Sequence, residues 1–142
     1  MIALLDINML IALFDAAHVH HKAAHAWMTK NRSVGWATCP ITQNGCVRVI
    51  SQPNYPGHLA VAETVRRLAA AVSPPDHIFW PDSVSLCDSS RFEPTRMLTS
   101  RNLTDIYLLG LAVEKGGRLV TFDRAIPPAA VSNAKARHLL AL

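Results

Sequence analysis

The chain has 142 residues, half of them apolar, which is enough for the packed core of a single domain over residues 1–142 and excludes a disordered protein. Its three cysteines, Cys39, Cys46 and Cys87, are odd in number and contain no CxxC pair, which argues against a disulfide framework or a cysteine-rich zinc site. A net charge of +4 favours a polyanionic partner such as nucleic acid.

The N-terminal segment MIALLDINMLIALF superficially resembles a secretion signal. It lacks a basic leader and a small-residue cleavage site, and Asp6 and Asn8 interrupt the apolar run, so we interpret it as part of the fold. No stretch approaches the roughly 18 consecutive apolar residues that a membrane helix needs. We therefore expect a soluble, cytoplasmic protein that has no membrane partner.

The first half of the chain is predicted to alternate short strands with helices. Residues 2–5 are an apolar run typical of a buried strand, and a helix follows over residues 9–14. A second helix is predicted over residues 20–30. A short strand at 35–38 then leads to a helix over 40–49, where a proline suits the first helical position.

The second half continues the alternation. Apolar side chains recur at three- and four-residue intervals within residues 59–72, as on one face of an amphipathic helix: Val61, Val65, Leu68 and Val72. Arg66 and Arg67 are expected to face water. The remaining predicted elements are a strand at 77–80, a helix at 103–114 ended by two glycines, and strands at 118–122 and 138–142. This order predicts an α/β fold with a parallel sheet covered on both faces.

Three of the ten acidic residues fall where such a fold places its ligands. Asp6 directly follows the first strand, Asp123 follows the strand at 118–122, and Asp105 lies in the first turn of the helix before that strand. Ligands of open parallel sheets bind beyond the carboxyl ends of the strands. Three carboxylates gathered there would repel one another unless a divalent cation neutralised them, and oxygen ligands select Mg²⁺ or Mn²⁺ rather than zinc.

Each carboxylate also has a purely structural interpretation. Asp6 could cap the helix that follows it, and Asp123 could form an ordinary turn. Asp105 could stabilise a helix N-terminus, with Asn102 as the capping residue three positions earlier. Taken singly these interpretations are favoured, but the coincidence of three acids favours a metal site.

The sequence resembles the PIN-domain ribonucleases, and specifically the VapC-type toxins of bacterial toxin–antitoxin pairs. The resemblance covers nearly the whole chain and is carried by LLDINMLIALFD, CPITQNGCVRVIS and LTDIYLLGLAVEKGGRLVTFDR. It implies a five-stranded parallel sheet with flanking helices and the Mg²⁺- or Mn²⁺-dependent cleavage of RNA. It also implies metal-binding roles for Asp6 and Asp105 and a supporting role for Asp123. The family usually has a glutamate in the second segment, where this chain has Gln43.

The implied reaction is in-line hydrolysis of a phosphodiester by water, which leaves 5′-phosphate and 3′-hydroxyl ends. Asn8, Thr104 and Thr121 lie near the acids and could orient water around the cation, and Gln43 could offer a carbonyl oxygen or simply be a hydrated surface residue. Arg48 and Arg124 are candidates for contacts with RNA phosphates.

Other functions remain open. Gln43 would suit a noncatalytic module that binds RNA or a partner protein. A receiver domain or a haloacid-dehalogenase-like phosphatase also gathers acids at strand ends, but such a phosphatase needs a second aspartate where this chain has Asn8. The histidines His18, His20, His21 and His25 have spacings that could bind zinc, although no HExxH pattern is present. The tryptophans Trp27, Trp36 and Trp80 could stack on bases or could be core residues.

The resemblance also implies partners. A cognate antitoxin would wrap the protein and cover the acidic crevice, and the RNA substrate would be a tRNA or rRNA. Homodimers are usual in the family, and the apolar helix faces near Leu10, Leu13 and Val61 could form the contact.

Overall fold

Five short parallel strands form the centre of the computed structural model, which describes residues 1–142: β1 (Ala3–Leu5), β2 (Trp36–Thr38), β3 (His77–Phe79), β4 (Arg118–Thr121) and β5 (Leu139–Ala141). The strand order is β3-β2-β1-β4-β5, and each neighbouring pair runs parallel. The predicted parallel α/β fold is therefore confirmed, and β1 lies at the middle of the sheet.

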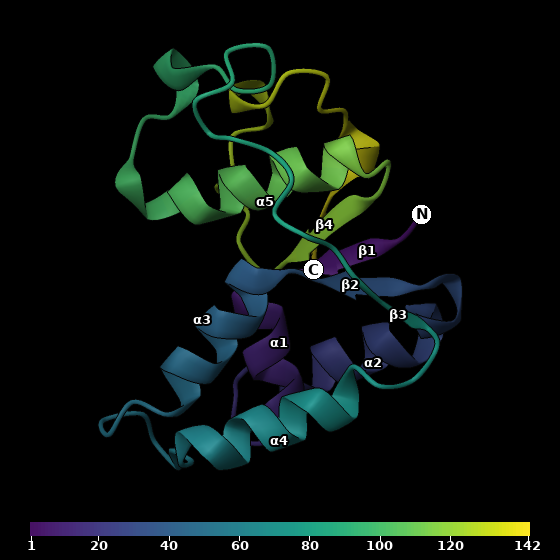
Figure 1. Ribbon diagram of the computed structural model, residues 1–142, viewed down its shortest axis with the longest axis vertical. Helices are drawn as coiled ribbons and strands as arrows, with labels where there is room; N and C mark the ends of the chain where they lie inside the picture. The colour runs from purple at the N-terminus through teal and green to yellow at the C-terminus, as the bar shows by residue number, and fades with distance from the viewer.

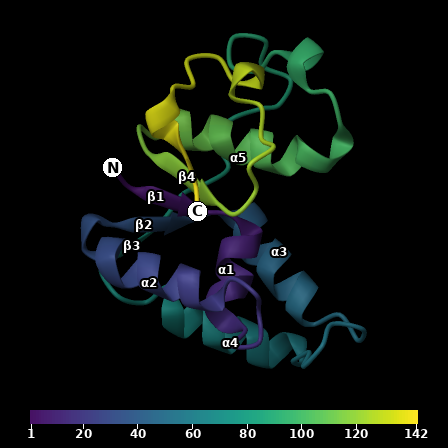
Figure 2. The ribbon, with the colours of Figure 1, turned by 180° about the vertical axis from the view of Figure 1, so that it is seen from behind.

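Five α-helices cover the two faces of the sheet: α1 (Ile7–Phe14), α2 (His21–Asn31), α3 (Pro40–Ile50), α4 (Val61–Ala71) and α5 (Leu103–Glu114). Helices α1 to α4 form the layer below the sheet in Figure 1, whereas α5 lies above it, and the reverse view in Figure 2 shows the same division. Their bounds lie within about two residues of those predicted. None of these helices has the length and the apolar character that crossing a bilayer requires.

Alternation of side chains along the strands creates a separate core on each face. Leu4 and Leu119 point towards α5 and join its cluster of 15 buried residues. Leu5 and Val120 point the other way and join a cluster of 12 buried residues with α1, α2 and α3. Because both of its faces are buried, the central strand β1 is apolar along its whole length, as is usual in parallel sheets.

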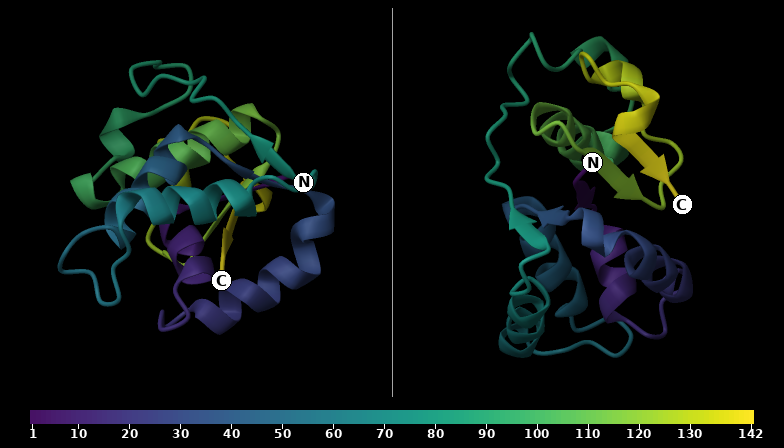
Figure 3. Two further views of the ribbon diagram at one scale, coloured as in Figure 1. Left: turned by 60° about the horizontal axis from the view of Figure 1, so that its bottom comes forward. Right: turned by 90° about the vertical axis from the view of Figure 1, so that its right-hand side faces the viewer.

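A long irregular segment, residues 80–102, connects the two layers. It leaves β3 on the lower side of the molecule and climbs along one edge to the layer of α5, as the right-hand view of Figure 3 shows. The segment then contributes Val84 and Phe92 to the core above the sheet. It ends at the N-terminus of α5, where Asp105 lies.

The buried face of α4 differs from the prediction. The helix buries Thr64 and Leu68, whereas Val61 and Val65 are 58% and 48% exposed. The three- and four-residue spacing predicted a helix correctly but did not identify which face of it packs against α3. The two arginines of α4 face water as expected.

The burial of the tryptophans and of Leu10 decides two further expectations, one about base stacking and one about a dimer contact. All three tryptophans are buried in the core, so none of them offers an exposed surface for base stacking. Leu10, on the buried face of α1, is also inaccessible and therefore cannot contribute to the apolar dimer contact that was predicted near it.

Candidate functional site

Asp6 occupies the point where β1 ends and α1 begins. Its carboxylate accepts a hydrogen bond from the backbone N–H of Met9 at 2.6 Å, so Asp6 caps α1 as the structural interpretation predicts. Its other oxygen accepts a hydrogen bond from the hydroxyl of Thr121, on β4, at 2.5 Å. With 2% of its surface exposed, Asp6 is held in a single orientation between two elements.

Thr121 joins Asp6 to Asp123. Besides donating to Asp6, its hydroxyl oxygen accepts a hydrogen bond from the backbone N–H of Asp123 at 2.9 Å. The Asp123 carboxylate in turn accepts from the N–H of Ala125 at 2.8 Å, which is the turn-forming contact that the sequence predicts. The capping and turn interpretations are thus confirmed for these two acids, and each uses only part of the carboxylate's capacity to accept hydrogen bonds.

Asp105 differs from the other two acids because no hydrogen bond reaches its carboxylate. It lies half-buried in the first turn of α5. Asn102 was expected to cap this helix, but it makes no such contact and instead donates its side-chain N–H to the carbonyl of Ala125 at 2.8 Å. This bond ties the segment before α5 to the loop after Asp123.

The bond from Asn102 gives a first prediction. Asn102→Ala would remove the bond by which the buried Asn102 side chain holds the loop after Asp123, and we expect the free energy of unfolding to fall by about 1 kcal/mol. Asn8→Ala is the matched control, because Asn8 is exposed and makes no side-chain hydrogen bond, so its change should stay within about 0.5 kcal/mol. Urea titration of both variants measures the difference, and equal stabilities would contradict the structural role of Asn102.

The three carboxylates interact electrostatically. Burial raises the pKa of Asp6 to about 6, an effect that the hydrogen bonds from Thr121 and Met9 oppose and the charge of Asp123 reinforces. Burial, and then the charges of Asp6 and Asp123, raise the pKa of Asp105 to about 7. Asp6, Asp105 and Asp123 therefore form one negatively charged cluster at the carboxyl ends of β1 and β4.

The chemistry of this cluster fits a hard divalent cation. It supplies only oxygen ligands, and the half-buried carboxylate of Asp105 has no partner of its own. The side chains do not form a preformed cage, since no group of three histidine, cysteine or acidic residues lies close enough to hold a metal ion. A cation bound here would therefore have to draw the carboxylates of Asp6, Asp105 and Asp123 together.

The raised pKa of Asp105 gives a second prediction. The ionised carboxylate destabilises the fold progressively as the pH rises from about 4 to about 7, because the folded protein favours the protonated form more than the unfolded chain does. We expect Asp105→Asn to stabilise the metal-free protein at pH 8 by about 1 kcal/mol, after discounting for solvent exposure. Thermal unfolding at several pH values should show this gain shrinking towards pH 4.

Asp88→Asn serves as a control of opposite sign. Hydrogen bonds from Ser90 lower the pKa of Asp88, so its carboxylate stabilises the fold at neutral pH and loses that effect in acid. Asp88→Asn should therefore lower stability at pH 8. An Asp105→Asn protein that is less stable than the wild type at pH 8 would contradict the conclusion that burial and the charges of Asp6 and Asp123 destabilise the ionised Asp105.

The other residues predicted for the site occupy varied positions. Gln43 lies half-buried in the first turn of α3 and donates its side-chain N–H to the hydroxyl of Thr38 at 2.9 Å. Asn8 and Thr104 are exposed and make no side-chain hydrogen bonds. The contact of Gln43 with Thr38 could not be predicted from the sequence, because it forms only when the end of β2 packs beside α3.

The two candidate arginines lie on the surface. Arg124 immediately follows Asp123 in the chain, and its guanidinium donates to the carbonyl of Leu142 at 3.3 Å and forms no ion pair with an acidic side chain. Arg48 is exposed towards the C-terminal end of α3, and it also forms no ion pair. Both are free to meet a polyanion.

The four clustered histidines contact neighbouring groups rather than converging on one point. A ring nitrogen of His21 lies 2.7 Å from the carbonyl of Ala12, and one of His25 lies 3.0 Å from that of Leu13. The ring of His20 stacks on Phe122 with centroids 4.2 Å apart. Two of the histidines thus bond to carbonyls near the end of α1, and no three of them converge on a point that could hold a metal ion.

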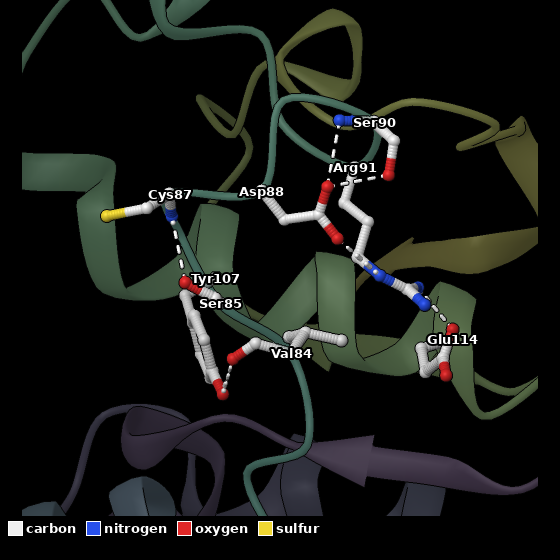
Figure 4. Close-up of polar contacts among 8 residues, drawn as sticks. All are labelled: Val84, Ser85, Cys87, Asp88, Ser90, Arg91, Tyr107 and Glu114. Carbon is white, nitrogen blue, oxygen red and sulfur yellow. Dashed lines mark hydrogen bonds and ion pairs between the residues drawn. The ribbon is translucent and has the colours of Figure 1, made fainter.

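The largest cavity of the fold is separate from the carboxylates. It encloses about 470 Å³ at the C-terminal end of α5 and includes Arg91 and Glu114 in its lining. Figure 4 shows the Arg91 guanidinium between the carboxylates of Asp88 and Glu114, which neutralise it. Glu114 lies nine residues after Asp105, or about 13 Å along the helix. The paired arginine leaves no free charge for a phosphate, and the acidic cluster is the better candidate site.

Comparisons with known proteins identify the family of the chain. The model of the PIN domain family matches residues 3–131. Ribonuclease VapC44 of Mycobacterium tuberculosis is 49% identical over 140 residues, covering 99% of this chain and 99% of its own. Ribonuclease VapC39 of the same organism is 45% identical over 134 residues, covering 92% of this chain and 94% of its own.

A solved structure shows the same fold. The crystal structure of Mycobacterium tuberculosis VapC20, described as a sarcin-ricin loop cleaving toxin, matches with a TM-score of 0.63 and covers 91% of this chain and 95% of its own. At 12% identity the likeness shows a shared architecture and carries no information about the substrate.

Proposed function

The chain belongs to the PIN-domain family and to its VapC ribonucleases, and from this we propose that it hydrolyses RNA at the cluster of Asp6, Asp105 and Asp123. The observation that carries the assignment to these residues is the electrostatic coupling of three carboxylates contributed by β1, α5 and the loop after β4. A structural role accounts for the hydrogen bonds of Asp6 and Asp123. Asp105 lies in the first turn of α5, as its structural interpretation predicts, but its half-buried carboxylate accepts no hydrogen bond and its pKa is raised by the other two acids.

The residues of the cluster have distinct tasks in the proposed reaction. A bound Mg²⁺ or Mn²⁺ would supply an activated water and offset the charge that develops on the scissile phosphate. Met9 and Thr121 fix the orientation of the Asp6 carboxylate, so one of the proposed metal ligands is already held in place. Asp105 contributes the unpaired carboxylate, and Asp123 is positioned through its backbone contact with Thr121. Attack by water would leave 5′-phosphate and 3′-hydroxyl ends.

Family membership places the protein in a toxin–antitoxin system as the ribonuclease toxin, with RNA as substrate and an antitoxin protein as partner. We propose that the RNA is a tRNA or an rRNA and that Arg124 and Arg48, which lack acidic partners, contact its phosphates. We further propose a homodimer, for which the exposed Val61 and Val65 of α4 offer an apolar surface.

A second candidate function is the binding of RNA without cleavage. Two observations favour it: Gln43 carries no charge where the family usually has a glutamate, and the three acids form no preformed metal cage. A domain of this kind would retain the basic surface and the fold while lacking the cation affinity that hydrolysis requires.

Incubation of the purified protein with end-labelled tRNA and rRNA fragments tests the proposal. We expect cutting in Mg²⁺ or Mn²⁺, no cutting in EDTA, and no cutting by Asp105→Asn prepared identically. Binding of RNA without cutting would support the noncatalytic module, and Gln43→Glu would then show whether a restored charge restores cleavage. Equal cutting by the wild type and Asp105→Asn would place the activity elsewhere and refute the proposal.

A further inference from the structure

The rings of His20 and Phe122 form an aromatic stack at the surface of the protein. Their centroids lie 4.2 Å apart and their planes are within 9° of parallel. His20 is exposed and immediately precedes α2, whereas Phe122 directly follows β4, is half-buried and packs against the core of α1, α2 and α3. The core thus backs the stack from one side, and the His20 ring remains accessible to solvent.

The stack is joined to the acidic cluster through the backbone at the end of β4. Phe122 stands between Thr121 and Asp123, and the Cα atoms of consecutive residues are about 3.8 Å apart. The Thr121 hydroxyl donates to Asp6 at 2.5 Å, and the backbone N–H of Asp123 donates to the same hydroxyl at 2.9 Å. An RNA strand that is bound at the cluster and extends towards the start of α2 therefore meets the His20 ring.

The contacts of His20 differ from those of the histidines that follow it in α2. Ring nitrogens of His21 and His25 lie 2.7 and 3.0 Å from backbone carbonyls near the end of α1, so those two rings have a structural role. No hydrogen bond reaches the ring nitrogens of His20, and its side chain does not cap α2. Only its backbone N–H is bonded, to Nδ1 of His18 at 3.0 Å. The ring of His20 is therefore held by aromatic contact and keeps its polar atoms free.

Two unpaired cations lie close to the stack in the chain. Lys22 is exposed in the first turn of α2, two residues after His20, and Arg124 is exposed two residues after Phe122. Neither side chain forms an ion pair with an acid. Both cations are thus available to the phosphates of an RNA strand whose base stacks on His20.

We propose that His20, backed by Phe122, is a stacking platform for an unpaired base of the RNA that is cut at the acidic cluster. This inference rests on the proposed function and adds a requirement on the substrate. Aromatic side chains stack on the faces of single-stranded bases, whereas a base inside a duplex already has its faces covered by its neighbours. The RNA must therefore present an unstacked nucleotide, as single strands and loops do.

Binding of fluorescein-labelled single-stranded RNA, followed by fluorescence anisotropy in Mg²⁺, tests the platform without measuring cleavage. All proteins are full-length and carry Asp6→Asn, which keeps the RNA intact. We expect His20→Ala to weaken binding about 10-fold relative to this parent protein, because it removes the stacking of one base. His20→Phe keeps an aromatic ring and should bind within about 2-fold of the parent.

His58→Ala is the matched control, because His58 is an exposed histidine whose side chain makes no hydrogen bond and stacks on no ring. It should leave the affinity for RNA unchanged. Equal affinities of His20→Ala and His58→Ala would overturn the platform, and so would an equal loss in His20→Phe and His20→Ala. A parent protein that binds none of the RNA would overturn it as well. The ribonuclease proposal is decided separately, by the cleavage of labelled RNA by the wild-type protein.

Duplex RNA of the same sequence distinguishes stacking from a structural role of His20. The faces of paired bases are covered, so His20→Ala should bind the duplex within about 2-fold of the parent. In the single strand, 2-aminopurine placed at successive positions should be quenched at one of them by the parent and by His20→Phe, and not by His20→Ala. Equal weakening of single-stranded and duplex binding by His20→Ala would overturn the proposal, because the substitution would then act on the fold or on the phosphate contacts.

Discussion

Asp6→Asn is expected to lower RNA cleavage by about 1,000-fold or more while leaving the protein folded. The substitution removes a negative charge from the centre of the acidic cluster, and the loss of one electrostatic group in a catalytic site already has effects of this order. Its neighbours Asp105 and Asp123 cannot compensate, because Asp6 is the only one of the three acids that is anchored on both of its oxygens. Cleavage of end-labelled RNA at saturating Mg²⁺ measures the loss.

The fold should survive this substitution for a specific reason. Asparagine caps helices as well as aspartate does, so its side-chain oxygen can still accept from the N–H of Met9. The raised pKa of Asp6 also shows that the buried carboxylate is destabilising when ionised. We expect the thermal midpoint of Asp6→Asn to equal or exceed that of the wild type.

Asp88→Asn is a matched control for the activity measurement, since it removes a carboxylate at the far end of α5 and should leave cleavage unchanged. An Asp6→Asn protein that is folded and cuts RNA at the wild-type rate would contradict the assignment of the site. Loss of cleavage together with loss of the fold would contradict the argument that asparagine preserves the cap.

Gly117→Ala is expected to destabilise the protein by about 3 kcal/mol or more. A Cβ atom at this position would lie 2.5 Å from the backbone carbonyl oxygen of Ile2 and 2.6 Å from the ring of Trp80. Neither neighbour can withdraw easily, because the Ile2 carbonyl accepts a hydrogen bond from Arg118 in the sheet and Trp80 is buried in the core. Overpacking against backbone forces the strands apart.

Gly116→Ala separates this clash from the general effect of losing a glycine. Gly116 has a φ of +67° but nothing lies within 4 Å of its added Cβ, so alanine there should cost only about 1 kcal/mol from backbone strain. Urea unfolding of the two variants should show the larger loss for Gly117→Ala. Equal losses would mean that the approach of β4 to β1 is looser than the structure shows.

The elements that were predicted well are those whose burial leaves a periodic or continuous signal. The central strand β1 is buried along its whole length, so it appears as a short apolar run, and two glycines mark the end of α5. The parallel order of the strands predicts that Asp6 and Asp123 lie at the same carboxyl edge of the sheet. The electrostatic coupling of these two acids with Asp105 agrees with that expectation.

The features that were predicted poorly depend on contacts between distant segments. The spacing of apolar residues could not show that α4 buries Thr64 and exposes Val65, because packing against α3 determines which face of α4 is buried. Asn102 resembles a helix cap in sequence, but the carbonyl of Ala125, 23 residues away, attracts its side chain. The stacking of His20 on Phe122 has the same character, since the two residues are distant in the chain and meet only in the folded protein.

The ionised carboxylates of the acidic cluster destabilise the fold, and this affects which substitutions the protein can accept during evolution. Aspartate and asparagine codons differ by one base, so a single transition converts Asp6 or Asp105 to its amide. The resulting chain is expected to be inactive yet at least as stable as its parent, because the substitution removes a buried charge. Cells that escape the toxic activity by this route would still accumulate folded protein, which could continue to occupy the antitoxin. Selection for folding stability alone would therefore not retain these three acids.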